Sequence, residues 1–598
     1  MQAKTSGRAR KGFLAHASRY FSNAWRAAAG AGVAGALGLT GAVAQAAAGD
    51  DLQQRSQEQE RRAQERFEQL EKLTSRRDVN LSPEPSKTLS RIPDGEAPCF
   101  VIGELHLQLS APDTNAEPWA WLLDQADGHG ILPEPDPVLG RCLGAQGIQT
   151  VVDRLQQALV ARGYITSRLY APPQNLQGGQ LALQLVPGRV RAVRWSEGSG
   201  QRGSRWNTVA LQPGDILNLR DIEQSLENFK RVPTAEADIN IAPADEPGYS
   251  DLLISHTQPQ PFRLNVTADD SGSSSTGKYQ GSFTVSYDNW WTLSDLFYVT
   301  WQGDLGGADP GPRGTRGQVM HYSVPWGYNL LSFTASSNRY HQSVAGANAN
   351  VLYSGTSAQA DVKLSRVIQR DSVGKTVLSL KGFQRRSNNY IDDTEVEVQR
   401  RVVAGLEWGL NVRRAWAPLN VEANLGYRVG TGAWGALPAP EEAFGEGTSR
   451  MRLWLADVSV QAPLDLGGRR WNWNTQWRWQ RESTPLTPQD RFSIGGRYTV
   501  RGYDGLSVLS AERGWLLRNE LSTPLTPQIQ AYVGVDYGHV GGPSAEQLVG
   551  QNLTGAVLGL RGQAGPLQWE VFAGTPLRKP NHFKTSNTTA GFNLSVSY

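Results

Sequence analysis

The residues best suited to a specific ionic contact lie in one glycine-rich stretch, residues 495–505, between two segments with a strand-like pattern. At its centre stand Val500, Arg501, Gly502 and Tyr503. A guanidinium that leaves bulk water needs a carboxylate partner, because an unpaired buried charge is strongly unfavourable. Glycines permit positive φ and close backbone approach, so the stretch predicts an ordered loop with a paired arginine. A surface turn with a solvated arginine is the alternative.

A carboxylate suited to Arg501 follows in the alternating segment 531–538. Asp536 stands there between Gly534 and Gly538, with apolar residues at the intervening positions. Successive side chains of a strand point to opposite faces. If the apolar neighbours face lipid, Asp536 faces the interior, where an inward loop can reach it. The alternative is that Asp536 is one of many interior charges.

Residues for catalysis or cofactor binding are not grouped in recognisable motifs. The sequence contains neither G-x-S-x-G nor H-E-x-x-H, and its eight histidines are scattered. Residues 272–279 resemble a phosphate-binding loop, but Tyr279 stands where Ser or Thr should coordinate Mg²⁺. We therefore expect no catalytic residues, no metal site and no cofactor, and we interpret residues 272–279 as a turn.

The composition indicates a membrane protein that crosses the bilayer with strands. The chain has 598 residues, 19 Trp, 18 Tyr and 64 Gly, yet only 39% hydrophobic residues and a mean hydropathy of −0.44. After the N-terminus no apolar run approaches the roughly 20 residues of a spanning helix. Alternation of lipid-facing and interior residues hides a membrane β-barrel from hydropathy analysis. The chain is also long enough for several domains.

The N-terminus predicts a signal peptide over residues 1–48. Six basic residues and no acidic residue accompany an apolar run at 27–44 and two small-residue cleavage patterns. Removing this segment takes the formal net charge from +3 to −3. The mature chain is then nearly neutral, which gives no argument for a nucleic-acid partner. A transit peptide is the competing interpretation.

Residues 49–77 predict a helix that is polar on nearly every side. Residues 51–77 are rich in Gln, Glu and Arg and contain neither Gly nor Pro. Such a helix cannot drive its own burial in an apolar core. It could be a solvated coiled-coil fragment, disordered, or seated in a water-filled pore. Residues 78–98 are rich in Pro and Ser and predict a linker.

Two small α+β units follow, at 99–188 and 189–260. In the first, Ile148, Val152, Leu155 and Leu159 predict an amphipathic helix, flanked by strands expected at 99–107, 164–171 and 180–186. In the second, a helix beginning near residue 218 precedes strands at 238–242 and 251–255. The even cysteine count of an exported chain allows a disulfide between Cys99 and Cys142. An exposed sheet edge beside a helix can accept an extended peptide.

Residues 261–598 predict the barrel. In segment 471–479 four tryptophans share one face, and polar side chains share the other, as expected for a strand between lipid and water. The last strand, 591–598, alternates in the same way and carries Phe592 and Tyr598 on its apolar face. About 337 residues, at roughly 10 residues per strand plus turns and loops, allow about 16 antiparallel strands. A soluble β-sandwich is the alternative.

The motif Val500-Arg501-Gly502-Tyr503, with the order of segments around it, resembles the TpsB transporters of two-partner secretion. The resemblance implies a plug helix, a linker, two POTRA domains and a barrel of about 16 strands with an inward signature loop at about 481–513. It also implies a latch between this loop, including Gly496, and the Gly534-x-Asp536-x-Gly538 strand. Cys99 and Cys142 are placed like a cysteine pair found in part of the family. Phe592 and Tyr598 resemble its assembly signal, which more often ends in Phe.

The resemblance implies a pore in the outer membrane of a Gram-negative bacterium, with its POTRA domains in the periplasm. Such a pore recognises an unfolded TpsA-type exoprotein and exports it without nucleotide: the plug leaves and the Arg501 loop rearranges. The implied partners are this exoprotein, outer-membrane lipids and the barrel assembly machinery, and we expect a monomer that binds no nucleic acid. An outer-membrane protein insertase and a passive porin are the alternative functions.

Overall fold

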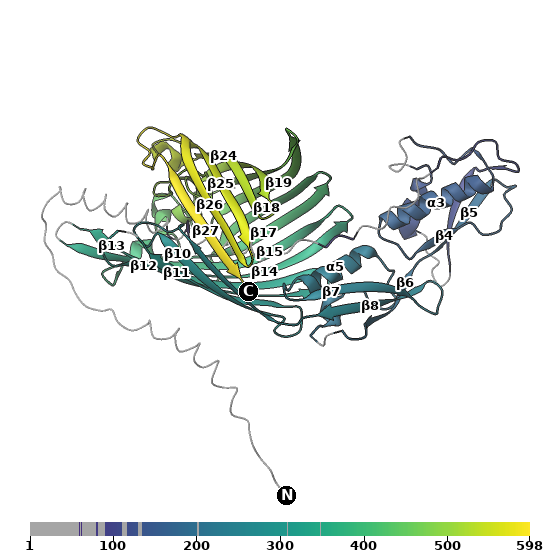
Figure 1. Ribbon diagram of the computed structural model, residues 1–598, viewed down its shortest axis with the longest axis horizontal. Helices are drawn as coiled ribbons and strands as arrows, with labels where there is room; N and C mark the ends of the chain where they lie inside the picture. The colour runs from purple at the N-terminus through teal and green to yellow at the C-terminus, as the bar shows by residue number, and fades with distance from the viewer. Residues whose placement is uncertain are drawn as a thin grey trace, which may run out of the picture. The chain divides into compact units, whose positions relative to one another are not determined.

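The computed structural model describes residues 59, 61–62, 79–81, 90–110, 117–128, 134–199, 202–307, 309–346 and 349–598. Figure 1 shows their helices and strands. The signal peptide predicted for residues 1–48 lies outside the described residues, as do most of the predicted plug helix and much of the predicted linker. Gln59, Arg61 and Arg62 of the plug segment are described, and all three are helical.

The first small domain is an α+β unit built on a three-stranded sheet. Its elements are β1 (Phe100–Val101), β2 (Glu104–Leu109), the 3-10 helix η1 (Glu117–Gln125), β3 (Cys142–Leu143), α3 (Ala145–Ala161), β4 (Arg168–Tyr170) and β5 (Gln180–Val186). The sheet order is β2-β5-β4, with β2 parallel and β4 antiparallel to β5. The single strand expected at 99–107 is wrong. The chain changes sheets at Ile102, whose side chain is buried in the core, so β1 pairs with β3 instead.

Helix α3 packs against this sheet because its apolar residues recur at helical spacing. Val151, Leu155 and Leu159 are fully buried, and so are the three leucines that share one face of β5. The helix ends at Arg162, after which Gly163 has a φ of +95°, a conformation that favours glycine. The helix and the strand at 180–186 were therefore predicted correctly. The strand expected at 164–171 is shortened to β4.

The second small domain has the same layered design. It contains β6 (Arg189–Trp195), α4 (Arg205–Thr208), α5 (Leu219–Lys230), β7 (Glu236–Pro243) and β8 (Tyr249–Thr257), with sheet order β6-β8-β7. The Asn218 side chain caps α5 by accepting a hydrogen bond from the Arg220 amide at 2.9 Å. Ile222, Leu226 and Phe229 of α5 are buried against the sheet. The helix and both strands confirm the expected α+β pattern.

Sixteen long antiparallel strands of the described chain close into one barrel. They are β9 (Phe262–Asp269), β10 (Tyr279–Asp288), β11 (Leu296–Gly306), β12 (Arg313–Trp326), β13 (Asn329–Ala345), β14 (Asn350–Asp371), β15 (Gly374–Ile391), β17 (Arg401–Trp416), β18 (Leu419–Thr431), β19 (Arg452–Leu466), β20 (Arg469–Glu482), β23 (Arg513–Thr526), β24 (Ile529–Gly541), β25 (Asn552–Ala564), β26 (Leu567–Arg578) and β27 (Thr589–Ser597). The two-residue β16 (Thr394–Glu395) extends the β15 hairpin, and β15 pairs directly with β17. The soluble sandwich is therefore wrong, and the expected strand number is confirmed.

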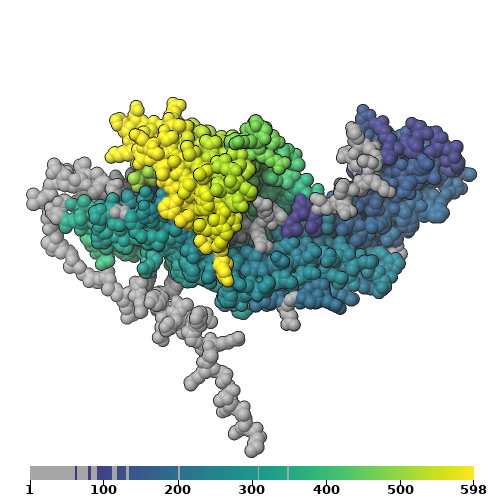
Figure 2. Space-filling view, in the orientation of Figure 1, coloured from purple at the N-terminus to yellow at the C-terminus, as the bar shows by residue number. Residues whose placement is uncertain are grey.

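The barrel closes where β27 meets β9. Five residue pairs join these strands, from Asn593 opposite Asp269 to Ser597 opposite Asn265. Figure 2 shows the last strands, in yellow, beside the teal strands that begin the barrel. Residues 272–279 lie between β9 and β10, so the segment that resembles a phosphate loop is the connection between two barrel strands.

The outer face of the barrel carries the apolar side chains of the alternating pattern. Trp473 and Trp477 of β20 lie opposite Leu521 and Leu517 of β23, so apolar residues meet apolar residues across the strands. On β24, Val533 and Val535 are each about half exposed, whereas Asp536 is fully buried. This arrangement is what a lipid-facing surface around a polar interior requires. No helix in the described part of the chain is long and apolar enough to cross a membrane.

The segment between β20 and β23 folds back as a small inner unit. It contains the 3-10 helix η4 (Pro488–Asp490) and a short hairpin of β21 (Phe492–Ile494) and β22 (Leu509–Ala511), which pair antiparallel. Residues 495–508 connect these two strands, and we call this connection the signature loop. The expected inward segment at about 481–513 matches the chain between the end of β20 and the start of β23.

Candidate functional site

The centre of the candidate site is the contact between Arg501 of the signature loop and Asp536 of β24. The Arg501 amide and Nε both donate to Oδ2 of Asp536, at 2.9 and 2.8 Å, and Nη2 donates to Oδ1 at 2.8 Å. Asp536 is fully buried and Arg501 is 8% exposed. The surface-turn interpretation of this loop is therefore wrong. A bidentate guanidinium–carboxylate contact fixes the loop in orientation as well as position.

A second carboxylate shares Arg501. Nη1 of Arg501 donates to Oε2 of Glu520 at 2.7 Å, and Arg561 of β25 donates to the other oxygen of Glu520 at 2.8 Å. Arg518 lies opposite Asp536 in the β23–β24 register, with its Nε 3.9 Å from Oδ2 of Asp536. Sequence reasoning missed Glu520. The available signal was the pair of charges at 518 and 520, which share one face of a predicted strand.

The loop fits against the barrel wall because four glycines leave room for it. A Cβ at Gly534 would stand 2.6 Å from Nη2 of Arg501, and one at Gly538 would stand 2.8 Å from Cγ2 of Val500. On the next strands, a Cβ at Gly555 would stand 1.9 Å from the Arg501 carbonyl oxygen. One at Gly574 would stand 2.9 Å from the Cα of Gly502. The sequence predicted the first two glycines and missed Gly555 and Gly574.

Apolar packing and backbone contacts hold the rest of the loop. Val500 and Tyr503 are buried in a cluster with residues of β21, β22, β24 and β25. The Tyr503 hydroxyl donates to the Arg578 carbonyl at 2.7 Å. Gly502 has a φ of +98°, which favours glycine between these two anchors. Near the start of the loop, the Gly496 amide donates to Oγ1 of Thr499 at 3.1 Å.

The signature loop also contacts the strands that close the barrel. Nη1 of Arg497 lies 2.9 Å from Oδ1 of Asp270, next to the end of β9, and Nη2 donates to the Phe592 carbonyl of β27 at 2.9 Å. The Phe592 amide donates to the same Asp270 oxygen at 2.9 Å. Tyr598 lies just beyond β27, and its amide and carbonyl pair with Leu264 of β9 at 2.9 Å each. Phe592 and Tyr598 thus both lie where the barrel closes.

The described plug residues lie against the inner wall of the barrel. Arg62 donates to the carbonyls of Gly505 and Ser271 at 2.8 and 3.1 Å, and Thr276 donates to Oε1 of Gln59 at 3.1 Å. We call these contacts the plug seat. Gln59 and Arg62 are buried, which contradicts a solvated position for these two residues.

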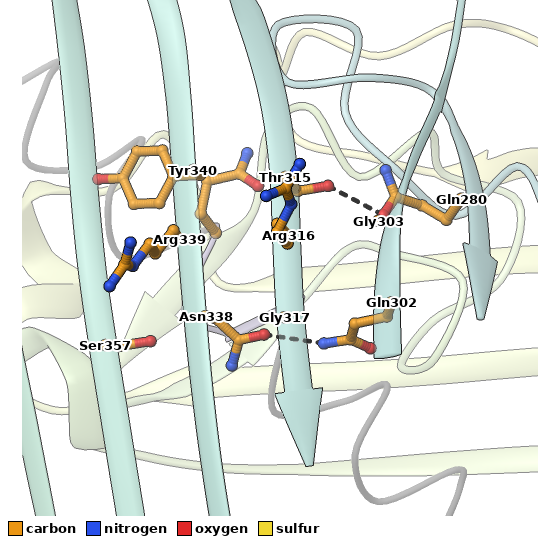
Figure 3. A pocket seen from close by; sticks show the side chains of 11 residues that line it. Gln280, Gln302, Gly303, Thr315, Arg316, Gly317, Asn338, Arg339, Tyr340 and Ser357 are labelled. Atoms are coloured by element: carbon orange, nitrogen blue, oxygen red, sulfur yellow. Dashed lines mark hydrogen bonds between the residues drawn. The ribbon is translucent and has the colours of Figure 1, made fainter. Parts of the chain in front are cut away.

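The wall around Gln59 is polar. A pocket of about 20 Å³ lies between Gln59 and side chains from five neighbouring strands, β10 to β14 (Figure 3). Gln302 donates to Asn338 at 2.8 Å, and Thr315 donates to Gln280 at 3.0 Å. The plug seat therefore joins the Arg62 guanidinium and the Gln59 amide to uncharged groups of the wall, and Arg316 and Arg339 also line the pocket. This composition suits a polar helix in a water-filled pore.

In the first small domain, a disulfide joins Cys99 to Cys142. The same region caps α3, because the Glu96 carboxylate accepts hydrogen bonds from the amides of Gly144, Gln146 and Gly147 at 2.8 to 2.9 Å. Burial acts to raise the pKa of Glu96, but these amide donors hold the pKa below its usual value. The disulfide and the carboxylate cap together fix the start of α3.

Asp136 forms the ionic centre of this domain. Burial acts to raise its pKa, but the Ile92 amide and the guanidinium groups of Arg154 and Arg141 outweigh burial and lower it. Arg154 is fully buried and also donates to the carbonyls of Ala126 and Asp136. A charge pair this deep is stable only while both partners stay ionised.

Comparison with known protein families identifies the chain. Residues 248–562 match the family model of the haemolysin secretion/activation protein ShlB/FhaC/HecB, which is more than half of the chain. Residues 127–188 match a ShlB-type POTRA domain, and residues 189–243 match a POTRA domain. The chain belongs to the ShlB/FhaC/HecB family. It is a TpsB-type outer-membrane transporter, and its two small domains are POTRA domains that lie in the periplasm.

Individual relatives extend this similarity over almost the whole chain. The outer membrane transporter CdiB-2 of Burkholderia pseudomallei is 35% identical over 92% of this chain and 95% of its own length. The hemolysin transporter protein HpmB of Proteus mirabilis is 26% identical over 80% of each chain. The structure of CdiB from Acinetobacter baumannii matches with a TM-score of 0.78 and 29% identity over 92% of this chain and 99% of that one. All three fit a TpsB transporter better than a passive porin.

Proposed function

We propose that this TpsB transporter captures one large unfolded TpsA-type exoprotein in the periplasm and passes it through the barrel to the cell surface. The plug helix closes the pore at rest and leaves it during transport, without nucleotide or catalysis. The protein acts as a monomer in outer-membrane lipid, and the barrel assembly machinery inserts it by its C-terminal strand. The observation that carries this proposal is the plug seat, a polar closure inside a closed barrel.

Capture takes place at the β4 edge of the first POTRA domain. In the described chain, β4 pairs with β5 on one side only. A groove of about 530 Å³ lies beside it, between α3 and the segment after β4, and its lining includes Ile148, Tyr170 and Leu176. Main-chain pairing gives affinity for an extended peptide, and side-chain pockets give selectivity.

A glutamine of α3 satisfies backbone hydrogen-bonding groups at the β4 edge. The Gln156 side chain donates to the Ser167 carbonyl at 3.0 Å and accepts from the Leu169 amide at 3.0 Å. An amide placed in this way imitates the contacts of a neighbouring strand. An incoming extended segment replaces these two hydrogen bonds with equivalent ones, so exchange at this edge leaves no backbone group unpaired.

The plug and the signature loop behave differently in this mechanism. The sequence resemblance implied that the Arg501 loop rearranges during transport. The loop instead has a buried ion pair, apolar packing and four glycine contacts on three strands. We propose that it stays against the wall while the plug leaves, so that the translocating chain passes beside it.

The test is secretion of the large exoprotein encoded next to this gene, in cells with wild-type protein, with Arg501→Ala or with no transporter. Export that requires the transporter supports the proposal. Equal export without the transporter overturns it for that exoprotein. Assembly of other outer-membrane barrels is measured in the same cells, because a general defect there favours the insertase instead.

The capture edge has its own variant and control. Tyr170→Ala changes a side chain of the groove that is 43% exposed, whereas Leu139→Ala changes a side chain of the same domain outside the groove that is 55% exposed. We expect Tyr170→Ala to reduce secretion and Leu139→Ala to leave it unchanged. Equal secretion by both variants would exclude the groove as the capture site.

A further inference from the structure

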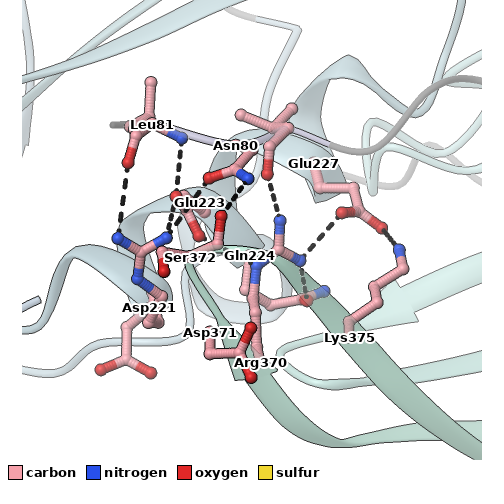
Figure 4. Close-up of polar contacts among 12 residues, drawn as sticks. Asn80, Leu81, Asp221, Glu223, Gln224, Glu227, Arg370, Asp371, Ser372 and Lys375 are labelled. Atoms are coloured by element: carbon pink, nitrogen blue, oxygen red, sulfur yellow. Dashed lines mark hydrogen bonds and ion pairs between the residues drawn. The ribbon is translucent and has the colours of Figure 1, made fainter. Parts of the chain in front are cut away.

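Three described residues of the linker, Val79, Asn80 and Leu81, lie where the second POTRA domain meets the β14–β15 turn of the barrel (Figure 4). Their partners come from helix α5 and from the end of β14. We call Arg220 and Glu223 of α5, together with Arg370 of β14, the linker clamp. None of these residues belongs to the signature loop or to the plug seat.

The linker clamp binds backbone groups. The Leu81 amide donates to Oε1 of Glu223 at 2.6 Å, and the Leu81 carbonyl accepts from Nη2 of Arg220 at 3.4 Å. The Val79 carbonyl accepts from Nη2 of Arg370. Contacts to backbone amides and carbonyls do not depend on side-chain identity. Arg220 also donates to Oδ1 of Asn80 at 3.4 Å, but most of the clamp's contacts fit an extended chain of any sequence.

The side chains of the bound segment alternate. Val79 and Leu81 pack against the apolar core of the second POTRA domain. Asn80 points to the barrel turn, where its Nδ2 donates to the Ser372 carbonyl at 2.5 Å. Alternation of this kind is the pattern of a strand. The ligand class that fits is an extended segment with apolar residues at positions i and i+2.

The clamp residues are also paired with one another, independently of the linker. Glu223 lies 2.5 Å from Arg220 and 3.2 Å from Arg370, and Arg370 lies 2.9 Å from Glu227. Glu223 and Arg370 are almost fully buried. None of these ion pairs includes the linker, because Arg220 and Glu223 pair within α5 and Arg370 joins α5 directly to the barrel. The site therefore stays formed and can accept a second extended chain.

We propose that the linker clamp is a binding site for extended apolar-x-apolar segments, filled by residues 79–81 at rest and by the exoprotein during transport. This inference rests on the proposed function. Residues 79–81 follow the plug segment in the chain. When the exoprotein displaces them from the clamp, the plug segment is no longer attached to the second POTRA domain through the linker. Arrival of the exoprotein at the second POTRA domain is thereby coupled to opening of the pore.

The first experiment places a spin label at residue 80 through Asn80→Cys in the full-length protein in lipid vesicles. The native cysteines are joined in the disulfide, so the label attaches at one site. Because Asn80 is exposed, the clamped backbone restricts the label only in part, and we expect its mobility to rise after addition of the purified secretion domain of the exoprotein. Mobility at rest equal to that of a label on an unfolded chain would contradict binding of the linker by the clamp. Mobility that does not change after that domain has bound would contradict the exchange.

The second experiment measures single-channel conductance without any exoprotein, so it does not depend on the cargo. Leu81→Asp removes an apolar contact with the POTRA core, and we expect openings to become roughly tenfold more frequent. Leu139→Asp is the matched control, since Leu139 is 55% exposed in the first POTRA domain. Equal opening frequencies in the two variants would contradict the claim that binding of residues 79–81 holds the plug in the pore.

A variant of the clamp itself provides an independent test in case the linker variant Leu81→Asp does not fold. Glu223→Gln keeps the shape of the side chain but weakens its pairing with the Leu81 amide and with Arg220 and Arg370, and we expect more frequent openings there too. If Glu223→Gln and Leu81→Asp both open as rarely as the wild-type protein, the inference is wrong, but the proposed export function still stands. Equal export with and without the transporter would instead contradict the proposed function.

Discussion

The signature loop and the plug seat both lie inside the barrel, but different forces hold them. The loop has a buried carboxylate–guanidinium pair, with hydrogen bonds of 2.8 to 2.9 Å, and an apolar cluster beneath it. Gln59 and Arg62 of the plug segment contact the Thr276 hydroxyl and the carbonyls of Ser271 and Gly505, which are uncharged groups. Charge pairs that lose a partner in a buried site are costly, whereas polar contacts in a wet lumen exchange readily with water.

This difference indicates which part moves. A loop that leaves Asp536 would remove the three hydrogen bonds that Arg501 donates to this buried carboxylate, and Arg518, at 3.9 Å, would be left as a weaker charge partner. A plug that leaves its seat gives up hydrogen bonds between Arg62 or Gln59 and uncharged groups of the wall. We therefore propose that the loop is a fixed part of the wall and that the plug is the removable part. The hydrogen bond from Arg62 to the Gly505 carbonyl can break without removing either partner of the Arg501–Asp536 pair.

The largest effect is expected for Arg501→Ala. Removing one member of a buried pair destabilises its site by about 3–5 kcal/mol. Asp536 and Glu520 would lose their shared donor, so we expect the loop to detach and secretion to fall strongly. Proteolysis of the loop in purified protein measures detachment, and secretion is measured in cells with matched barrel levels. Arg450→Ala, a matched change at another barrel loop, is the control. If the loop of Arg501→Ala resists proteolysis as well as the wild-type loop does, Arg501 does not hold the loop against the wall.

A smaller effect is expected for Glu520→Gln. Arg501 keeps all three hydrogen bonds to Asp536, whereas the charge-assisted contacts of Glu520 to Nη1 of Arg501 and to Arg561 are weakened. Such a contact contributes about 1.5–3 kcal/mol at most. Protease protection of the loop should therefore lie between those of wild type and Arg501→Ala. If Glu520→Gln detaches the loop as fully as Arg501→Ala, the central role assigned to Asp536 is wrong.

A third prediction concerns the plug seat. Arg62→Ala removes the contacts to Ser271 and Gly505, and we expect openings in planar bilayers to become roughly tenfold more frequent. Loop protection should remain at the wild-type level, because Arg501 and Asp536 are untouched. Increased loop proteolysis in Arg62→Ala would show that loop and plug are held as one unit. Unchanged conductance would show that Arg62 does not fix the plug.

The smallest effect lies outside the barrel, in the first POTRA domain. The pKa of Asp136 is lowered in the folded domain, so its ion pairs contribute stability above its ordinary pKa of about 3.9. This contribution is lost as the pH falls from there through the lowered pKa. Hydrogen exchange in α3, corrected for intrinsic rates, should rise over this range. Asp136→Asn should be less protected at neutral pH and show a weaker pH response, and an identical response in both proteins would contradict this assignment.

Local patterns in the sequence predicted the elements that depend on nearby residues. The apolar spacing of α3 and α5 and the tryptophans of β20 sufficed for two helices and a lipid-facing strand. The Arg501 and Asp536 contact could be expected from alternation together with a family resemblance. Glu520, Gly555 and Gly574 could not, because their roles depend on strand register and on where a long loop meets three strands. The strand expected at 99–107 is divided at Ile102 between two sheets. This division depends on tertiary packing and cannot be predicted from strand propensity.

The most direct test joins each inner element to its neighbour with a short reducible thiol crosslinker and measures secretion. Gln59→Cys with Thr276→Cys fixes the plug, and Asp504→Cys with Ser586→Cys fixes the loop. The native side chains of these pairs are in hydrogen-bond contact at 3.1 and 3.0 Å. We predict that fixing the plug abolishes secretion until the crosslink is reduced, whereas fixing the loop leaves secretion near the wild-type level. Secretion that continues with the plug fixed, or stops with the loop fixed, would contradict the account.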